Sequence, residues 1–346
     1  MISIREYDLE SLKEEMKRLG YPGFRGEQIF TWVHKRGVLS PEEMTNLPRE
    51  IREKLEVGNM SLETEKVSQE DQTRKILYRL RDDHFVETVL MKYRYGNSLC
   101  ISTQVGCRMG CAFCASTIGG LKRNLTAGEM LGQVYETNAL LEDKINHVVL
   151  MGSGEPLENY DEVIKFLRII NHEKGYHLSL RNITLSTCGL IPEILKLADE
   201  NLPVTLAISL HGASDETRGR LMPINRKYPI DELIRAVDYY ILKTHRRVTF
   251  EYAMIKGVND SAGEAHLLRD RLQGRLVHVN LIPVNAVEES GFFPSLEKDL
   301  VKFKSILEKK GINTTIRREL GSDINAACGQ LRNTYHPAKV EIVQRH

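Results

Sequence analysis

The sequence predicts an α/β protein, a partial and open (βα)6 barrel that follows a small N-terminal helical domain and a β-hairpin. From about residue 96 onward, short runs of apolar and β-branched residues alternate with longer stretches of helical periodicity, as in parallel sheets. About six such units are expected, fewer than the eight of a closed barrel. Motifs containing cysteine, glycine or histidine directly follow three of the expected strands. Because barrels carry their sites at the carboxyl ends of their strands, we expect the active site there.

Residues 1–58 form the expected helical accessory domain. Apolar residues recur at helical spacing from Leu9 to Leu19, a second helix contains Trp32, and a third segment begins at Pro41. Basic residues are frequent along these segments. They fit either an ordinary solvated surface, which composition alone favours, or an RNA-docking surface.

Residues 59–94 are expected to form a β-hairpin linker. Two alternating runs, 75–80 and 85–90, flank a pair of aspartates that is typical of a turn. Glu87 lies between apolar neighbours in the second run. By itself it fits an ordinary outward-facing strand carboxylate.

Residues 95–346 contain the barrel and a C-terminal extension. The expected strands are 99–104, 147–151, 183–187, 204–210, 248–254 and 277–282, with a further short one at 314–317. The expected helices are 126–141, 160–171, 192–200, 231–243, 263–272 and 296–309. The first of these helices opens with a capping box, in which Thr126 is followed three positions later by Glu129.

The composition excludes several classes of protein. The chain has 346 residues, of which 41% are hydrophobic and 27% charged, as in a water-soluble globular protein. It contains no apolar run long enough for a membrane helix or a secretory signal, so we expect a cytoplasmic protein without a membrane partner. The formal net charge is only +1, so a nucleic acid would have to meet a local basic patch.

Three cysteines, Cys107, Cys111 and Cys114, stand within eight residues after the first expected barrel strand. Thiolates hold iron–sulfur clusters, which usually take four of them. Three local ligands without a fourth nearby predict a 4Fe–4S cluster with one iron open for chemistry. A zinc site would need a fourth Cys or His at matching spacing, and a disulfide framework fits poorly with a long chain that has few cysteines.

A glycine-rich turn, 152–156, follows the second expected barrel strand. Its glycines allow a close backbone approach to a ligand, and Glu155 could accept hydrogen bonds from an ammonium group. Other polar residues at expected strand ends could also contact a ligand or be structural; these are Ser186, Ser209, His211 and Asn285.

Three further cysteines, Cys100, Cys188 and Cys328, have a buried, inert thiol as their ordinary interpretation. The sequence gives no reason why residue 188 is a cysteine.

The C-x-x-x-C-x-x-C spacing resembles that of the radical S-adenosylmethionine (SAM) superfamily. The ordered set of motifs resembles more specifically the RlmN family of bacterial RNA methyltransferases, over nearly the whole chain. The segments that carry this resemblance are Cys100, the three-cysteine loop, 154–156, 209–211, 221–225, 278–283, 326–331 and, in the helical N-terminus, 24–29 with Trp32. Family members methylate carbon 2 of adenine 2503 in 23S ribosomal RNA, and some also modify adenine 37 of transfer RNAs.

The resemblance implies a cofactor set and a division of roles. Cys107, Cys111 and Cys114 would hold a 4Fe–4S cluster whose open iron binds SAM, and cleavage of SAM would give a deoxyadenosyl radical. The implied SAM contacts are Gly154, Glu155, Ser186, Ser209, Leu210, His211 and Asn285.

Three further roles follow from the resemblance. Cys328 would take a methyl group from SAM, Glu87 would act as the base, and Cys100 would attack the Cys328 sulfur and leave a Cys100–Cys328 disulfide. The partners implied are 23S ribosomal RNA, transfer RNA, an external electron donor and a thiol reductant.

Two alternatives stay open at this point. The related Cfr enzymes methylate carbon 8 of the same adenine and share the cysteines, although Pro156 and the segment 283–285 look more like RlmN. The other alternative is a metal-stabilised RNA-binding module without catalysis.

Overall fold

A computed structural model describes residues 1–58, 60–285 and 291–331. A ten-stranded sheet organises this part of the chain, in the order β14-β13-β12-β11-β10-β9-β6-β5-β4-β3. The neighbours from β6 to β14 pair in parallel, and β3, β4 and β5 extend the sheet in antiparallel fashion. The two edges, β14 and β3, do not pair with each other within the described residues. The barrel is therefore open, as the sequence predicts.

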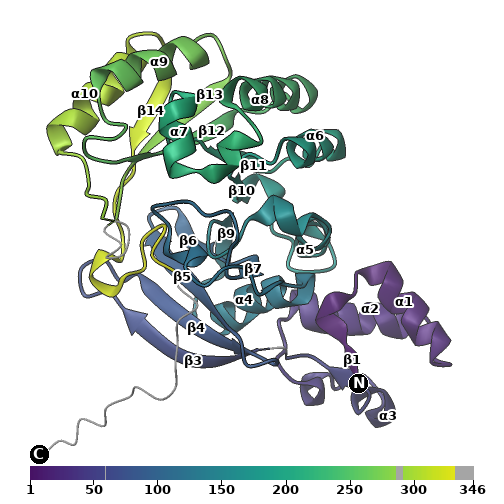
Figure 1. Cartoon of the computed structure of the whole chain (residues 1–346). Coiled ribbons are helices and arrows are strands. Elements are labelled where there is room, and N and C mark those ends of the chain that lie inside the picture. The colour runs from purple at the N-terminus through teal and green to yellow at the C-terminus, as the bar shows by residue number, and fades with distance from the viewer. Residues whose placement is uncertain (59, 286–290, 332–346) are drawn as a thin grey trace, which may run out of the picture.

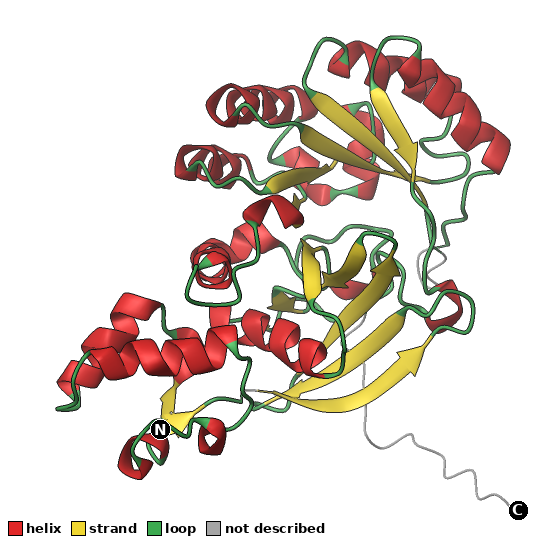
Figure 2. Ribbon diagram, turned by 180° about the vertical axis from the view of Figure 1, so that it is seen from behind, coloured by secondary structure: helices red, strands yellow, loops and turns green. Residues whose placement is uncertain are grey.

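The parallel strands and the helices between them confirm the expected alternation. The strands are β6 (Gly96–Cys100), β9 (Ile145–Leu150), β10 (Ile183–Thr187), β11 (Thr205–Ser209), β12 (Val248–Met254), β13 (Val277–Pro283) and β14 (Asn313–Ile316). The helices are α4 (Ala127–Ala139), α5 (Tyr160–Asn171), α6 (Ile191–Glu200), α8 (Ile230–Thr244), α9 (Ala262–Leu272) and α10 (Glu297–Glu308), and they lie along the outer side of the sheet (Figures 1 and 2). A short helix that the sequence did not predict, α7 (Asp215–Leu221), ends against the three-cysteine loop, where Leu221 packs beside Cys111. The capping box at Thr126 and Glu129 is present at the start of α4.

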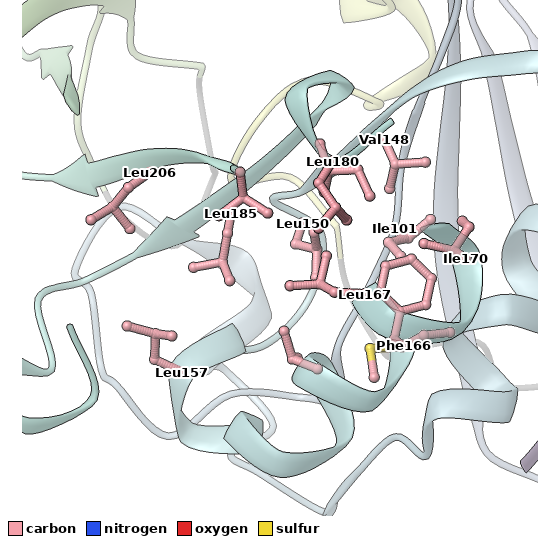
Figure 3. Close-up of a cluster of buried hydrophobic side chains, with 14 of the residues drawn as sticks. Ile101, Val148, Leu150, Leu157, Phe166, Leu167, Ile170, Leu180, Leu185 and Leu206 are labelled. Atoms are coloured by element: carbon pink, nitrogen blue, oxygen red, sulfur yellow. The ribbon is translucent and has the colours of Figure 1, made fainter. Parts of the chain in front are cut away.

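The core lies between the strands and these helices. Figure 3 shows Val148 and Leu150 of β9 and Leu185 of β10 beside Phe166 and Leu167 of α5, and all five side chains are buried. A helix with a hydrophobic stripe can bury that stripe only against another element, here the sheet. The packing fixes the strand ends, and with them the loops that follow.

The antiparallel part of the sheet differs from the expected linker. The hairpin of β4 (Arg74–Leu80) and β5 (Phe85–Tyr93) is confirmed, but β5 also pairs directly with barrel strand β6, with Val89 opposite Cys100. A strand that the sequence did not predict, β3 (Met60–Val67), pairs with β4. Its side chains are mostly exposed and polar, so no apolar alternation marks it. The hairpin is thus continuous with the barrel sheet.

The N-terminal residues form α1 (Leu9–Arg18), α2 (Phe24–Phe30) with a π-helical continuation at Thr31–Lys35, and α3 (Arg49–Arg52). The short strands β1 (Ile2–Ser3) and β2 (Leu55–Glu56) pair in parallel. The third expected segment, from Pro41, consists of a 3-10 turn followed by the four-residue helix α3. Pro48 immediately precedes α3 and lacks the N–H that a continuous helix would need.

Buried polar contacts attach this unit to α4, beside which it lies in Figure 1. Arg5, whose side chain is fully buried, pairs with Glu136 at 2.9 Å, and His34 Nδ1 lies 2.9 Å from the Tyr135 hydroxyl. Burial lowers the pKa of His34 from 6.5 to about 3, and the nearby Arg5 charge acts in the same direction. None of the helices described here is both long and apolar enough to span a bilayer.

Candidate active site

A cavity of about 980 Å³, partly open to solvent, lies at the carboxyl ends of the parallel strands. The predicted cluster ligands Cys107, Cys111 and Cys114 line it, and so do most of the predicted SAM contacts: Gly154, Glu155, Ser186, Ser209, His211 and Asn285. Side chains from many strand ends therefore meet in one place.

The three-cysteine loop is bracketed by a small antiparallel ladder of β7 (Gln104–Val105) and β8 (Arg123–Asn124). Gly106 opens the loop at φ 75°, and a Cβ there would collide with the Gly120 carbonyl. The left-handed backbone and this close approach both require glycine. The cysteines thus occupy a loop whose two ends are held by the chain itself.

Burial raises the pKa of all three thiols, that of Cys107 to about 12. Hydrogen bonds from the Met109 backbone to Cys107 and from Ser116 to Cys114 partly oppose this effect. Among the residues described, no three Cys, His, Asp or Glu side chains are placed to surround a single metal ion, as tetrahedral zinc would require. A 4Fe–4S cluster distributes its thiolates over different irons, so one loop with three thiols on a cavity wall fits such a cluster.

Glu155 is 3% exposed and is held by backbone donors on both carboxylate oxygens. Oε1 accepts from the Leu157 N–H at 3.0 Å, and Oε2 accepts from the Cys188 N–H at 2.7 Å. Burial raises the pKa of Glu155, while these hydrogen bonds favour its charged form. Gly154, at φ 107°, packs so tightly against Gln104 that a Cβ would come within 2.6 Å of that side chain. The turn therefore presents a fixed buried carboxylate to the cavity.

His211 is a neutral imidazole in this site. Its Nδ1 accepts a hydrogen bond from the Ala253 N–H at 2.9 Å, which places the proton on Nε2. Burial, followed by the charge of Arg218, lowers the pKa of His211 to about 3. The ring of Phe113, from the cysteine loop, packs edge-on against His211 at 4.7 Å between centroids.

The remaining predicted SAM residues are placed unequally. The hydroxyls of Ser186 and Ser209 lie 3.5 Å apart on neighbouring strands. Asn285 is nearly buried, and its Oδ1 has no hydrogen-bond partner in the described part of the chain, so a ligand donor would satisfy it. Leu210 differs, because its side chain is in the hydrophobic core and is not among the cavity-lining residues.

A second, smaller cavity of about 570 Å³ adjoins the first. Cys100 lines the smaller cavity, and Cys328 lines both. The wall common to the two is made by Met151, Ile282, Pro283, Asn285, Arg317 and Cys328. The structure therefore brings the C-terminal cysteine between the three-cysteine loop and Cys100.

The loop that carries Cys328 is attached to the rim of the large cavity. Asn285 Nδ2 donates to the Cys328 carbonyl at 3.1 Å, and the Ala115 N–H donates to the Gly329 carbonyl at 2.7 Å. Ser116 Oγ donates to the Leu331 carbonyl at 2.9 Å. In Figure 1 this yellow segment lies beside β5 and β6, where Cys100 packs with Ala326 and Leu331.

All six cysteines of the chain lie in described segments and are free thiols, so the implied Cys100–Cys328 disulfide is not present in this structure. Burial raises the pKa of Cys100 to about 12, with a smaller contribution from Cys328. The Arg317 guanidinium opposes this shift.

Glu87 lies on β5, on the strand face that also carries Val89, but it is not among the lining residues of either cavity. It pairs with Lys75 at 2.7 Å and is largely buried. Its carbonyl accepts a hydrogen bond from Ser102 Oγ at 2.8 Å, just beyond Cys100, so the expected proximity of the two strands is confirmed.

Several residues of the site were missed from the sequence. Glu251 and Arg317 both line the large cavity, and Asn280 Nδ2 donates to Glu251 Oε2 at 2.9 Å. An isolated carboxylate within an otherwise apolar strand was a detectable signal for Glu251.

Cys188 also lines the large cavity, and its carbonyl accepts a hydrogen bond from Arg218 Nη2 at 2.6 Å. The Arg218 side chain is fully buried and supports the turn at Cys188 from within.

The comparisons with known proteins agree with this geometry. The "Radical SAM superfamily" model matches residues 101–268, and the "Ribosomal RNA large subunit methyltransferase N-terminal domain" model matches residues 2–58. A relative from Clostridium perfringens strain SM101, named "Probable dual-specificity RNA methyltransferase RlmN", is 52% identical over 98% of this chain and 99% of its own. The protein of the same name from Clostridium novyi is 49% identical over 97% of this chain and 99% of its own.

A solved structure has the same fold. The crystal structure of a radical SAM methyltransferase from Sphaerobacter thermophilus superposes with a TM-score of 0.93, at 41% identity, over 96% of this chain and 100% of the other. Together with the curated relatives, this match confirms the resemblance that the motifs indicated. The chain belongs to the RlmN family of radical SAM RNA methyltransferases.

Proposed function

We propose that this enzyme methylates carbon 2 of adenine 2503 in 23S ribosomal RNA and carbon 2 of adenine 37 in transfer RNAs, through a methyl group carried on Cys328. The observation that supports this proposal is the position of Cys328 on the wall common to both cavities. One sulfur there can face a methyl donor in the large cavity and a resolving thiol, Cys100, in the small one.

The target atom explains why an ordinary methyl transfer is insufficient. Carbon 2 of adenine lies between two ring nitrogens and is electron-poor, so it does not attack an electrophilic methyl group. A 4Fe–4S cluster held by Cys107, Cys111 and Cys114 would supply, with bound SAM, the radical chemistry that joins the Cys328 methyl carbon to carbon 2.

The protein's own residues would perform the remaining steps. The Cys328 thiolate attacks the methyl carbon of a first SAM and forms an S–C bond, while the bond from that carbon to the SAM sulfur breaks and S-adenosylhomocysteine leaves. After the carbon is joined to the adenine, Glu87 accepts the proton from carbon 2. Cys100 then attacks the Cys328 sulfur, the bond from that sulfur to the RNA-bound carbon breaks, and the carbon takes a proton to become the methyl group.

This last step leaves a Cys100–Cys328 disulfide, which an external thiol must reduce before the next turnover. It requires the two Cα atoms to come within about 4.4–6.8 Å of each other. The radical chemistry also needs an external electron donor. The packing of Cys100 with Ala326 in one hydrophobic cluster supports the approach of the Cys100 and Cys328 Cα atoms.

The cavity wall suits SAM in its polar groups. Glu155 would receive the ammonium group, and the unpartnered Asn285 Oδ1 and the hydroxyls of Ser186 and Ser209 would receive ligand donors. Gly154 and His211 line the same wall. For Leu210 we propose a contact through its backbone, since its side chain is in the core.

We further propose residues 1–58 as an RNA-docking domain, 59–94 as its connection to the barrel, and 95–346 as the catalytic core. Two partly exposed pairs support the docking role. The Arg25 guanidinium lies 4.8 Å from the ring of Phe24, which is 55% exposed, and that of Arg36 lies 3.9 Å from the Trp32 ring. Aromatic faces with arginine recur where proteins bind RNA.

The test is an anaerobic incubation of the reconstituted protein with methyl-labelled SAM, a reductant and either 23S RNA fragments or transfer RNA. Mass mapping should find the methyl group on carbon 2, together with deoxyadenosine. Cys328→Ala should bind iron and sulfide as the wild type does and give no methylated RNA. Methylation of carbon 8 would favour the Cfr-like activity, and methylated RNA from Cys328→Ala would refute the carrier.

A further inference from the structure

Lys75, on β4, joins two parts of the candidate site that are distant in sequence. Its Nζ lies 2.7 Å from Glu87 Oε1 and donates to the Asn325 carbonyl at 3.0 Å. The side chains of Lys75 and Glu87 are 14% and 12% exposed.

The strand register explains how this contact arises. Lys75 stands opposite Val89 on β5, and Leu77 stands opposite Glu87, so the ammonium reaches diagonally across the ladder. Val89 lines the small cavity with Cys100. The Lys75–Glu87 pair therefore lies beside the small cavity, which Cys100 and Cys328 line.

The second contact reaches the loop that carries Cys328, because Asn325 precedes that cysteine by only three residues. The turn between β3 and β4 holds the same loop further upstream. There the Gly321 N–H donates to Asp71 Oδ2 at 2.8 Å, and the Gln69 N–H donates to Asp323 Oδ2 at 3.1 Å. The β3–β4 hairpin thus holds the loop through hydrogen bonds, and Lys75 of the same hairpin contacts both this loop and Glu87.

We propose that Lys75 is a positioning residue for proton removal from the RNA adduct, an inference that rests on the proposed function. In that step the C–H bond at carbon 2 breaks and the proton bonds to a Glu87 oxygen. The C–H electron pair restores the adenine ring, and the one electron that the radical adduct must also lose would pass to the 4Fe–4S cluster of the proposed function. The ammonium, 2.7 Å from Glu87 Oε1, fixes the orientation of the carboxylate that accepts the proton. Through its hydrogen bond to the Asn325 carbonyl, Lys75 also fixes the position of Glu87 relative to the loop that carries Cys328.

The inference separates two partial reactions. Methyl transfer from SAM to Cys328 does not use Glu87, so Lys75→Met should methylate Cys328 within about twofold of the wild type. Release of methylated RNA should fall about 10- to 100-fold, a part of what a general base contributes. The protein–RNA adduct should accumulate and be visible as a shifted band on a denaturing gel.

Conservative and matched variants complete the design. Lys75→Arg keeps the charge and donors and should restore most of the release rate. Lys302→Met removes an exposed lysine of α10, outside the site, and should behave as the wild type. Glu87→Gln should show the same accumulation, and the double variant should be no worse than Glu87→Gln alone, since both substitutions act on one step.

Three outcomes would overturn the inference: wild-type release from Lys75→Met, equal loss of Cys328 methylation and of release, or losses that multiply in the double variant. The second outcome would mean that Lys75 only supports the loop. A wild-type enzyme that places no methyl group on Cys328 would instead refute the proposed function itself.

Discussion

The two adjoining cavities are built in different ways. The large cavity takes its cysteines from one short loop and its other groups from successive strand ends, the usual arrangement in barrels. The small cavity is formed where the antiparallel extension meets a C-terminal loop, and its two cysteines, Cys100 and Cys328, are far apart in the sequence. The first construction suits a bound cofactor, whereas the second suits groups that must meet during a reaction.

The largest effect is expected from a substitution that removes a thiol from the small cavity and leaves the large cavity unchanged. Cys100→Ala should leave Cys328 methylation intact and stop the enzyme after a single event, because nothing then attacks the Cys328 sulfur. We expect a protein–RNA adduct in an amount that approaches that of the enzyme, measured by denaturing electrophoresis and mass spectrometry. Continued turnover of Cys100→Ala would show that the small cavity has no resolving role.

A smaller effect is expected from a substitution confined to the large cavity. Glu155→Gln removes the charge proposed to bind the SAM ammonium, and hydrogen bonds to charged groups contribute about 1.5–3 kcal/mol. SAM should therefore bind about 10- to 100-fold more weakly to the anaerobic reconstituted protein in equilibrium dialysis. Glu232→Gln, an exposed position on α8, is the matched control, and unchanged affinity of Glu155→Gln would remove Glu155 from the SAM site.

The smallest effect is expected from His34, which lies outside both cavities. It tests whether a change in the stability of the N-terminal unit leaves the cavities unaffected. The pKa of His34 is lowered by burial from 6.5 to about 3, so its stabilising contribution is complete above 6.5 and is lost as the pH falls toward 3. Between pH 6.5 and 5, the free energy of unfolding should fall by about 1 kcal/mol per pH unit from this group.

Urea denaturation of the wild type, of His34→Gln and of an exposed control, His266→Gln, would measure this dependence. The His34 variant should have the shallower pH profile. Equal slopes in all three proteins would contradict the assignment. Because His34 lies against α4 and not against the cavities, SAM affinity should not follow this change.

The sequence predicted those parts of the molecule that depend on local patterns. The spacing of Cys107, Cys111 and Cys114 is such a pattern, and so is the alternation that gives β6 to β14 and their helices. The glycine turn that presents Glu155 follows directly from a buried strand. These features survive folding unchanged because neighbours in the sequence determine them.

The parts that were missed depend on contacts between distant residues. The strand β3 is mostly exposed, lacks an apolar alternation, and pairs with β4 along its length. The burial of Arg218, the position of Arg317 on the cavity wall and the Lys75–Glu87 pair each depend on elements that come together in the folded sheet. No spacing rule in the chain reports such pairings.

The position of Cys100 has a consequence for the timing of the reaction. This thiol sits at the end of β6, a strand that is hydrogen-bonded to β5 on one side and to β9 on the other. The backbone of a residue between two paired strands is fixed by their hydrogen bonds. Any approach of the Cys100 and Cys328 sulfurs must therefore come from the irregular segment that bears Cys328. Each catalytic cycle would then depend on the movement of one short backbone segment, the one that bears Cys328, toward a Cys100 that stays in place.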